Sequence, residues 1–329
     1  MASASPVGVY LQSYLEPLAE WLARPDVTDI FVNRPGEVWL ETVGGVVERL
    51  DAPRLDETAL WRLARQIAGA AHQGVSREHP LLAATLPDGA RVQVVAPPAT
   101  RGPLALAIRK HVVADLTLDD YAQAGSFAEA RRGGDAAAVL NARLDALLAE
   151  GDVAGFLREA VRGRKNVVIA GGTSSGKTTF LNALLKEVPA HERLVLIEDT
   201  PEVKLTHANA IGLVAVRGEL GEASVDVDDL MQASLRLRPD RIILGELRGR
   251  EAFSFLRAVN TGHPGSITTV HADNPRGALD QIALMVLQAG AHLGRAEIVD
   301  YVSGVVDVFV QLVRRDGRRI VSQIVFEPR

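Results

Sequence analysis

The chain has 329 residues, of which 47% are hydrophobic and 23% charged, which is ordinary for a globular protein with room for two domains. Its formal net charge of −5 argues against a general nucleic-acid coat, because that function needs a basic surface. The absence of cysteine excludes disulfide bonds and cysteine-ligated zinc. No apolar run approaches the roughly 18 residues of a membrane span, and the first residues do not resemble a secretory signal. We therefore expect a cytoplasmic protein.

The first hundred or so residues predict a small α+β unit. Leu11, Leu15, Leu18 and Leu22 recur at helical spacing, which is typical of a helix that packs on a core or, alternatively, lies on a membrane surface. Asp56 is placed to cap a further helix. Strands are expected at residues 29–32, 37–40, 46–50, 91–95 and 104–109.

The remainder of the chain predicts a helical connector and then a larger α/β unit. Leucines at helical spacing in the Ala- and Arg-rich residues 114–164 indicate a structured connector. Short apolar strands are then expected at 167–170, 194–198, 241–245 and 266–270. Because helices separate them, they predict a mostly parallel sheet covered on both faces. The expected organisation is an N-terminal α+β domain at 1–113, a connector at 114–164 and an α/β domain at 165–329.

The most informative segment is Gly-Gly-Thr-Ser-Ser-Gly-Lys-Thr, between Gly171 and Thr178. It fits the phosphate-loop pattern at every fixed position and stands between an expected strand and an expected helix. Lys177 is expected to reach the β- and γ-phosphates, and Thr178 to ligate Mg²⁺, so the pattern predicts ATP and Mg²⁺ as cofactors. The bland alternative is a glycine-rich turn that binds nothing. The predicted nucleotide-binding residues are Gly171, Gly172, Thr173, Ser174, Ser175, Gly176, Lys177, Thr178 and Thr179.

Two expected strands end in acidic residues. Glu246 follows the apolar run that begins at Arg241, and we expect it to orient or deprotonate the attacking water. Gly245 stands where many phosphate-loop enzymes carry a metal-binding aspartate. Glu198, at the end of the run that begins at Leu194, is expected to fill that place in the Mg²⁺ shell. The alternative for both acids is a solvated strand end.

Two histidines, His263 and His271, flank the expected strand at 266–270. Framed by Gly and Thr and placed after the acidic strand, they predict a sensor of the γ-phosphate, since a histidine can donate a hydrogen bond to phosphate. Zinc binding by the pair is less well supported, because the chain offers no cysteine and no further ligand at metal spacing. A packed or surface histidine is the simpler alternative.

The motifs together resemble a known family. The segments GGTSSGKTT, IEDTPE, RPDRIILGELRG and TGHPGSITTVHADNP resemble the four signature motifs of the secretion ATPase superfamily, in which a Gly before the catalytic Glu is usual. The N-terminal segments VTDIFVNRPGEVWLE, LPDGARVQVVAPP and LAIRK look most like the VirB-type traffic ATPases of type IV secretion systems. The resemblance covers most of the chain, with residues near 122–155 the poorest match.

This resemblance implies a homohexameric ring of subunits, each with an N-terminal domain and a RecA-like ATPase domain. It implies nucleotide between the two domains, where Arg91 and Arg109 match phosphate-contacting positions. Arg238 and Arg248, beside the acidic strand, are further candidates. Each of these arginines is alternatively a surface residue. The implied function is a Mg²⁺-dependent ATPase motor for substrate transfer or pilus assembly, cytoplasmic or peripheral at the inner membrane, with other type IV secretion components as partners.

Other functions stay open at this stage. A type IV pilus or type II secretion motor belongs to the same family, although the type II version usually carries a four-cysteine zinc module. A nucleic-acid translocase would need a basic stripe along the ring pore, and sequence-specific nucleic-acid binding is not expected. A GTP-dependent switch lacks its Asn-Lys-x-Asp segment, and nothing marks the acceptor pocket of a kinase.

Overall fold

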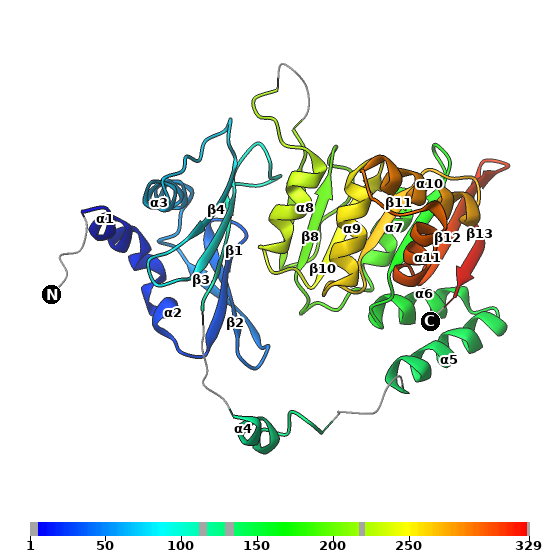
Figure 1. Ribbon diagram of the computed structural model, residues 1–329, viewed down its shortest axis with the longest axis horizontal. Helices are drawn as coiled ribbons and strands as arrows, with labels where there is room; N and C mark the ends of the chain where they lie inside the picture. The colour runs from blue at the N-terminus through cyan, green and yellow to red at the C-terminus, as the bar shows by residue number, and fades with distance from the viewer. Residues whose placement is uncertain (1–5, 112–116, 129–134, 217–220, 328–329) are drawn as a thin grey trace.

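The computed structural model describes residues 6–111, 117–128, 135–216 and 221–327. Within them, two β-sheets stand side by side, an N-terminal one and a larger C-terminal one (Figure 1). The N-terminal elements are α1 (Pro6–Leu15), the 3-10 helix η1 (Glu16–Leu18), α2 (Ala19–Ala23), β1 (Val27–Val32), β2 (Gly36–Thr42), β3 (Val47–Ala52), α3 (Glu57–Ala70), β4 (Leu81–Thr85), β5 (Arg91–Val95) and β6 (Ala105–Arg109).

The N-terminal sheet is antiparallel, in the order β3-β2-β1-β6-β5-β4. Its own core lies against α1–α3, where Leu11 and Leu18 are buried, so the leucine stripe packs on protein. Asp56 caps α3 by accepting a hydrogen bond from the Ala59 amide, as its position in the sequence predicted. The expected strands are present, and β2 and β3 form an antiparallel pair.

Among the described residues between the two sheets, the helices are α4 (Leu118–Gln123), α5 (Asp135–Ala149) and α6 (Val153–Arg162). Residues 112–116 and 129–134 of the predicted connector lie outside the described residues. Helix α4 has no buried residue and stands apart from both sheets (Figure 1). In contrast, Leu144 of α5 and Phe156 of α6 are buried in one core with strand β7. We therefore propose that the C-terminal unit begins near residue 135 rather than at 165.

The C-terminal sheet has the order β13-β12-β7-β11-β10-β8-β9 and is parallel except for the β12–β13 hairpin. The predicted mostly parallel sheet is confirmed, and the four expected strands are β7, β8, β10 and β11. The C-terminal elements are β7 (Val167–Gly171), α7 (Lys177–Leu185), β8 (Leu194–Glu198), β9 (Ala210–Val214), α8 (Val227–Leu235), β10 (Arg241–Leu247), α9 (Glu251–Asn260), β11 (Ile267–Val270), α10 (Pro275–Gln288), α11 (Arg295–Val305), β12 (Val308–Arg315) and β13 (Arg318–Phe326).

Alternate residues of the central strands face opposite sides of this sheet, as the two-residue period of a strand requires. Val168 and Ala170 lie in the core formed with α8–α11, whereas Val167 and Ile169 lie in the core formed with α6 and α7. Both faces are therefore covered, which explains why the strands are apolar throughout.

The two sheets are joined by a shared apolar cluster and by backbone pairing. Phe31 and Trp39 of the N-terminal sheet belong to the same buried cluster as the α8 side of the C-terminal sheet. In addition, Thr100 forms an antiparallel bridge with Leu213 of β9, the edge strand. Among the residues described, no helix has the length and apolar character needed to cross a bilayer.

Candidate nucleotide-binding site

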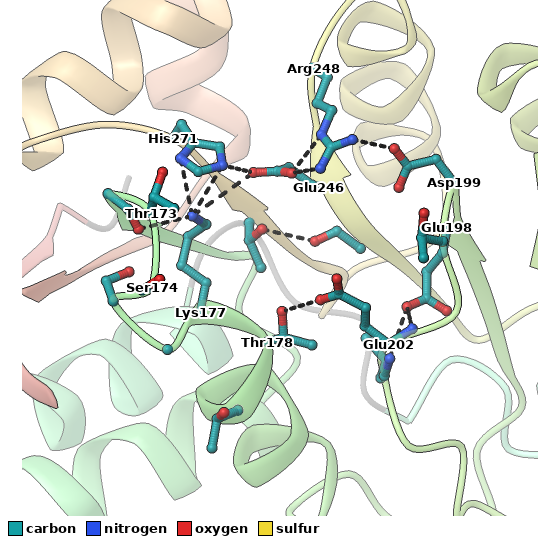
Figure 2. Close-up of a pocket in the computed structure, with 18 of the residues that line it drawn as sticks. Thr173, Ser174, Lys177, Thr178, Glu198, Asp199, Glu202, Glu246, Arg248 and His271 are labelled. Carbon is teal, nitrogen blue, oxygen red and sulfur yellow. Dashed lines mark hydrogen bonds and ion pairs between the residues drawn. The ribbon is translucent and has the colours of Figure 1, made fainter.

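A cavity of about 450 Å³ opens at the carboxyl ends of β7, β8, β10 and β11. This edge is where open parallel sheets bind ligands. The predicted loop residues 172–179 line the cavity together with Glu198, Glu246, Arg248 and His271. Residues predicted from four separate motifs are thus brought to one place (Figure 2).

The phosphate loop leads from β7 directly into α7. Gly176 stands at the start of α7 with a φ of 95°, a left-handed conformation that a residue with a Cβ rarely adopts. The first residues of α7 line the cavity, so the backbone amides and the positive end of the helix dipole would favour an anion bound there. The fixed glycine of the motif is required here by backbone geometry.

The Lys177 amine lies inside the loop. Its Nζ donates to the carbonyl oxygen of Gly171 at 2.9 Å and lies 3.9 Å from Oε1 of Glu246. Burial lowers the pKa of Lys177, and the Glu246 carboxylate opposes part of that effect. An anionic phosphate in the cavity would favour the ammonium form in the same way as Glu246.

Glu246 is held by two cationic or hydrogen-bonding neighbours. Arg248 Nε donates to Oε2 of Glu246 at 2.6 Å, and the same guanidinium reaches Asp199 at the end of β8. Nε2 of His271 lies 2.7 Å from Oε1 of Glu246, while Nδ1 lies 3.3 Å from Lys177 Nζ. These two distances place the His271 imidazole between the Glu246 carboxylate and the Lys177 ammonium.

The acid beside Thr178 is Glu202. The Thr178 hydroxyl donates to Oε2 of Glu202 at 3.1 Å. The Glu198 carboxylate, by contrast, accepts hydrogen bonds from the backbone amides of Glu202 and Val203 and forms an ion pair with Arg101. A hydroxyl and a carboxylate are hard oxygen donors that suit Mg²⁺. In the part of the chain that the structure describes, no cluster of three or more His, Asp or Glu side chains has metal-binding geometry. This is compatible with Mg²⁺, which is usually held by one or two protein groups together with substrate phosphates.

The structure does not bring every predicted residue to this cavity. Arg91 and Arg109 are cross-strand partners at one end of the N-terminal sheet, and neither lines the cavity. Arg238 pairs with Glu41 at 2.5 Å, across the seam between the sheets. His263 donates from Nδ1 to the Pro239 carbonyl at 2.9 Å, and burial lowers its pKa.

Glu202, Thr269 and Arg319 are among the lining residues that were not predicted from the sequence. Glu202 is the last acid of the segment IEDTPE, so the motif contained a signal for it. Thr269 lies on β11 and donates to the Gly245 carbonyl at 2.8 Å. Arg319 of β13 covers the loop at Gly176, and no pattern in the sequence near the C-terminus pointed to it.

Comparison with known proteins identifies the family of this chain. The sequence profile of the type II/IV secretion system protein family matches residues 12–321. The chain belongs to the type II/IV secretion system protein family. Within this family it is similar to proteins named type IV secretion system protein VirB11, with 36% identity to that of Bartonella henselae over 95% of this chain and 92% of the relative. It is 40% identical to the VirB11 protein of Brucella suis over 96% of this chain and 90% of the relative.

The chain is also similar to other members of the family. The type IV secretion system protein PtlH of Bordetella pertussis is 39% identical over 94% of this chain and 93% of its own length. A solved structure of the Brucella suis VirB11 ATPase, in complex with sulphate, superimposes with a TM-score of 0.91 at 38% identity, covering 98% of this chain and 96% of that one. The family and the α/β fold predicted from the sequence are therefore confirmed.

Proposed function

We propose that this chain is a Mg²⁺-dependent ATPase that serves as the motor of a bacterial type IV secretion system. The observation that carries the catalytic part is the convergence of Lys177, Glu246 and His271 within hydrogen-bonding or ion-pair distance at the mouth of the phosphate loop. Lys177 begins α7, whereas Glu246 and His271 lie at the ends of β10 and β11, and a structural turn would not need the three side chains together.

Each residue has a distinct task in the proposed reaction. Lys177 turns from the loop carbonyls to the β- and γ-phosphates of ATP, to which its charge is complementary. Glu246 orients the attacking water and accepts its proton, and Arg248 and His271 keep the carboxylate in one orientation. His271, which also faces Lys177, is placed to detect whether a γ-phosphate is present. Thr178 and Glu202 would hold Mg²⁺, with Glu198 behind them, and the ion would neutralise phosphate charge.

The biological role rests on the family. Its VirB11 and PtlH relatives are named as components of type IV secretion systems, and they match this chain over almost its whole length. We propose by extension that six copies form a ring, that it works beside other components of that system at the inner membrane, and that the chain is cytoplasmic or peripheral there. A pilus or type II motor is the alternative within the family.

We propose that Arg91 and Arg109 of the N-terminal sheet contact the nucleotide phosphates, although both lie outside this cavity. Arg91 and Arg109 face each other on adjacent antiparallel strands, and like charges placed opposite each other repel. Asp29 lies 3.9 Å from Nε of Arg109 and compensates part of this charge, and a phosphate group would supply a further anion to the pair. Since neither lines the cavity of its own chain, we propose that they reach nucleotide through another copy in the ring or after a domain movement.

The direct test is phosphate release from ATP by the purified chain, with Mg²⁺ and with excess EDTA. We expect turnover that requires Mg²⁺ and is lost in Lys177→Ala. Absence of ATP hydrolysis under conditions where the protein is folded and oligomeric would contradict the proposal.

A further inference from the structure

Arg101 crosses from the N-terminal unit into the C-terminal one and ends beside the nucleotide site. It follows β5 in the sequence, and its backbone amide donates to the Gly212 carbonyl of β9 at 2.9 Å. Thr100, the preceding residue, donates its hydroxyl to the same carbonyl at 3.2 Å. The segment is therefore fixed on the edge of the C-terminal sheet before the side chain begins.

The Arg101 side chain passes close to Gly212, where a residue with a side chain would obstruct it. A Cβ built on Gly212 would lie 2.6 Å from Cδ of Arg101, which is closer than side-chain atoms approach. The φ of Gly212 is not in the left-handed region, so the backbone conformation does not require a glycine. The glycine instead allows the Arg101 side chain to lie close to the backbone of β9. The arginine stem passes over β9 through the space that this glycine leaves.

The guanidinium makes two contacts at the end of this path. Nη1 donates to the Val203 carbonyl at 2.6 Å, and Nη2 forms an ion pair with Glu198. Glu198 is only 3% exposed, so its charge is compensated by Arg101 and by backbone amides and hardly at all by water. A Cβ on Gly245 would lie 2.8 Å from Cγ of Glu198, so a side chain at position 245 would displace the Glu198 side chain from its present place.

Glu198 in turn fixes the loop that carries the acid beside Thr178. Its Oε1 accepts from the backbone amides of Glu202 at 3.0 Å and Val203 at 2.9 Å. Glu202 then accepts from the Thr178 hydroxyl at 3.1 Å (Figure 2). The contacts form a continuous series from the N-terminal unit to the proposed metal-binding pair.

We propose that Arg101 is a positioning residue for this site: by clamping Glu198 and the Val203 carbonyl, it holds the loop of residues 199–203 so that Glu202 faces Thr178. The N-terminal unit thus acts on the ATPase site of its own chain through this loop. The inference rests on the proposed function for its catalytic consequence, but the clamp itself is a property of the nucleotide-free protein.

The first experiment measures amide hydrogen exchange in the nucleotide-free protein, for wild type, Arg101→Gln and Arg77→Gln. Arg77 is the matched control, because it also joins the two units, through an exposed ion pair with Glu222 at 2.6 Å that does not touch the loop. In Arg101→Gln, exchange at Glu202 and Val203 should quicken about tenfold, as expected for loss of charge-assisted hydrogen bonds. In Arg77→Gln it should be unchanged.

Equal exchange of residues 199–203 in wild type and Arg101→Gln would overturn the proposal. If amide exchange in Arg101→Gln is faster along the whole chain, the Arg101→Lys variant is measured in its place. Lysine keeps a cation for Glu198 but cannot contact Glu198 and the Val203 carbonyl together. Faster exchange confined to residues 199–203 in that variant supports the clamp, and an unchanged loop overturns it.

The second experiment titrates Mg²⁺ in the ATPase assay and measures ATP binding in EDTA. For Arg101→Gln we expect the Mg²⁺ concentration for half-maximal rate to rise about tenfold, with metal-free ATP affinity within about twofold of wild type. The same Mg²⁺ dependence in Arg101→Gln and Arg77→Gln would refute the catalytic consequence of the clamp. Failure of wild type to hydrolyse ATP would instead refute the proposed function, and the exchange measurement would still decide on the clamp.

Discussion

Nε2 of His271 lies 2.7 Å from Oε1 of Glu246, at the mouth of the phosphate loop. The two residues come from the ends of neighbouring parallel strands, β11 and β10, and their contact depends on the sheet order. This arrangement makes the histidine a direct neighbour of the proposed base, and we propose that both residues respond to the presence of the γ-phosphate.

The histidine prediction compares His271→Ala with His263→Ala. His271 contacts Glu246 and Lys177, whereas His263 is bonded to the Pro239 carbonyl outside the cavity. Loss of a hydrogen bond to a charged group is worth about 1.5–3 kcal/mol, so His271→Ala should slow ATP turnover about tenfold to a hundredfold. His263→Ala should slow it less. Equal effects of the two substitutions on kcat would contradict a specific role for His271.

The second prediction concerns Lys177→Ala, with Lys186→Ala at the exposed end of α7 as the matched control. Removal of the loop ammonium should weaken ATP binding about tenfold or more and abolish most turnover, because phosphate loses its charged donor. Lys186→Ala should bind ATP normally. A fluorescent ATP analogue reports the affinities.

Lys177 is also expected to take up a proton when ATP binds. Burial lowers the pKa of Lys177 in the empty protein, and phosphate should raise it by favouring the ammonium. Between the free and bound pKa values, ATP binding is therefore expected to take up a proton. Calorimetry in buffers of different ionisation enthalpy measures this uptake, which should disappear in Lys177→Ala. Persistence of the uptake would assign it to another group.

Oligomeric state provides a third prediction. Light scattering in the presence of ATP and Mg²⁺ should give six times the mass of one chain. A ring passes a local phosphate change to its neighbours only if subunits stay associated. A monomer with full ATPase activity at micromolar concentration would refute the motor.

The fourth prediction tests the N-terminal arginine pair. Arg91→Ala and Arg109→Ala should each weaken the binding of ATP more than the binding of ADP, because only ATP offers a third phosphate to the guanidinium. Arg65→Ala on α3, where the guanidinium lies over Trp61, is a suitable control far from the pair. Calorimetry with both nucleotides gives the ratio of affinities. An unchanged ratio in both variants would leave the two arginines as surface residues of a strand pair.

The sequence predicted the parts of the site that depend on local pattern. The phosphate loop, Glu246 and His271 each lie at the carboxyl end of an expected strand. Because the carboxyl ends of parallel strands meet at one edge of the sheet, these residues could be expected to lie together. The helix cap at Asp56 was predicted for the same reason, since capping is a local interaction.

The sequence could not predict contacts that cross the seam between the units. Glu198 was expected in the metal shell, but its orientation is set by Arg101, which lies in a distant part of the sequence. Glu202 takes the place beside Thr178 because the loop after β8 folds back on Glu198. Helices α5 and α6 were expected in a connector, and their place in the core of the C-terminal sheet depends on tertiary packing.

The most direct test of the central claim is a comparison of ATP binding and ATP turnover in Glu246→Gln, with Glu150→Gln, an exposed residue after α5, as control. Because Glu246 is proposed to act on water and not on the bound phosphates, the variant should retain wild-type ATP affinity while kcat falls by about 10² to 10⁴. Glu150→Gln should match wild type in both measurements. Full turnover in Glu246→Gln would contradict the proposed mechanism.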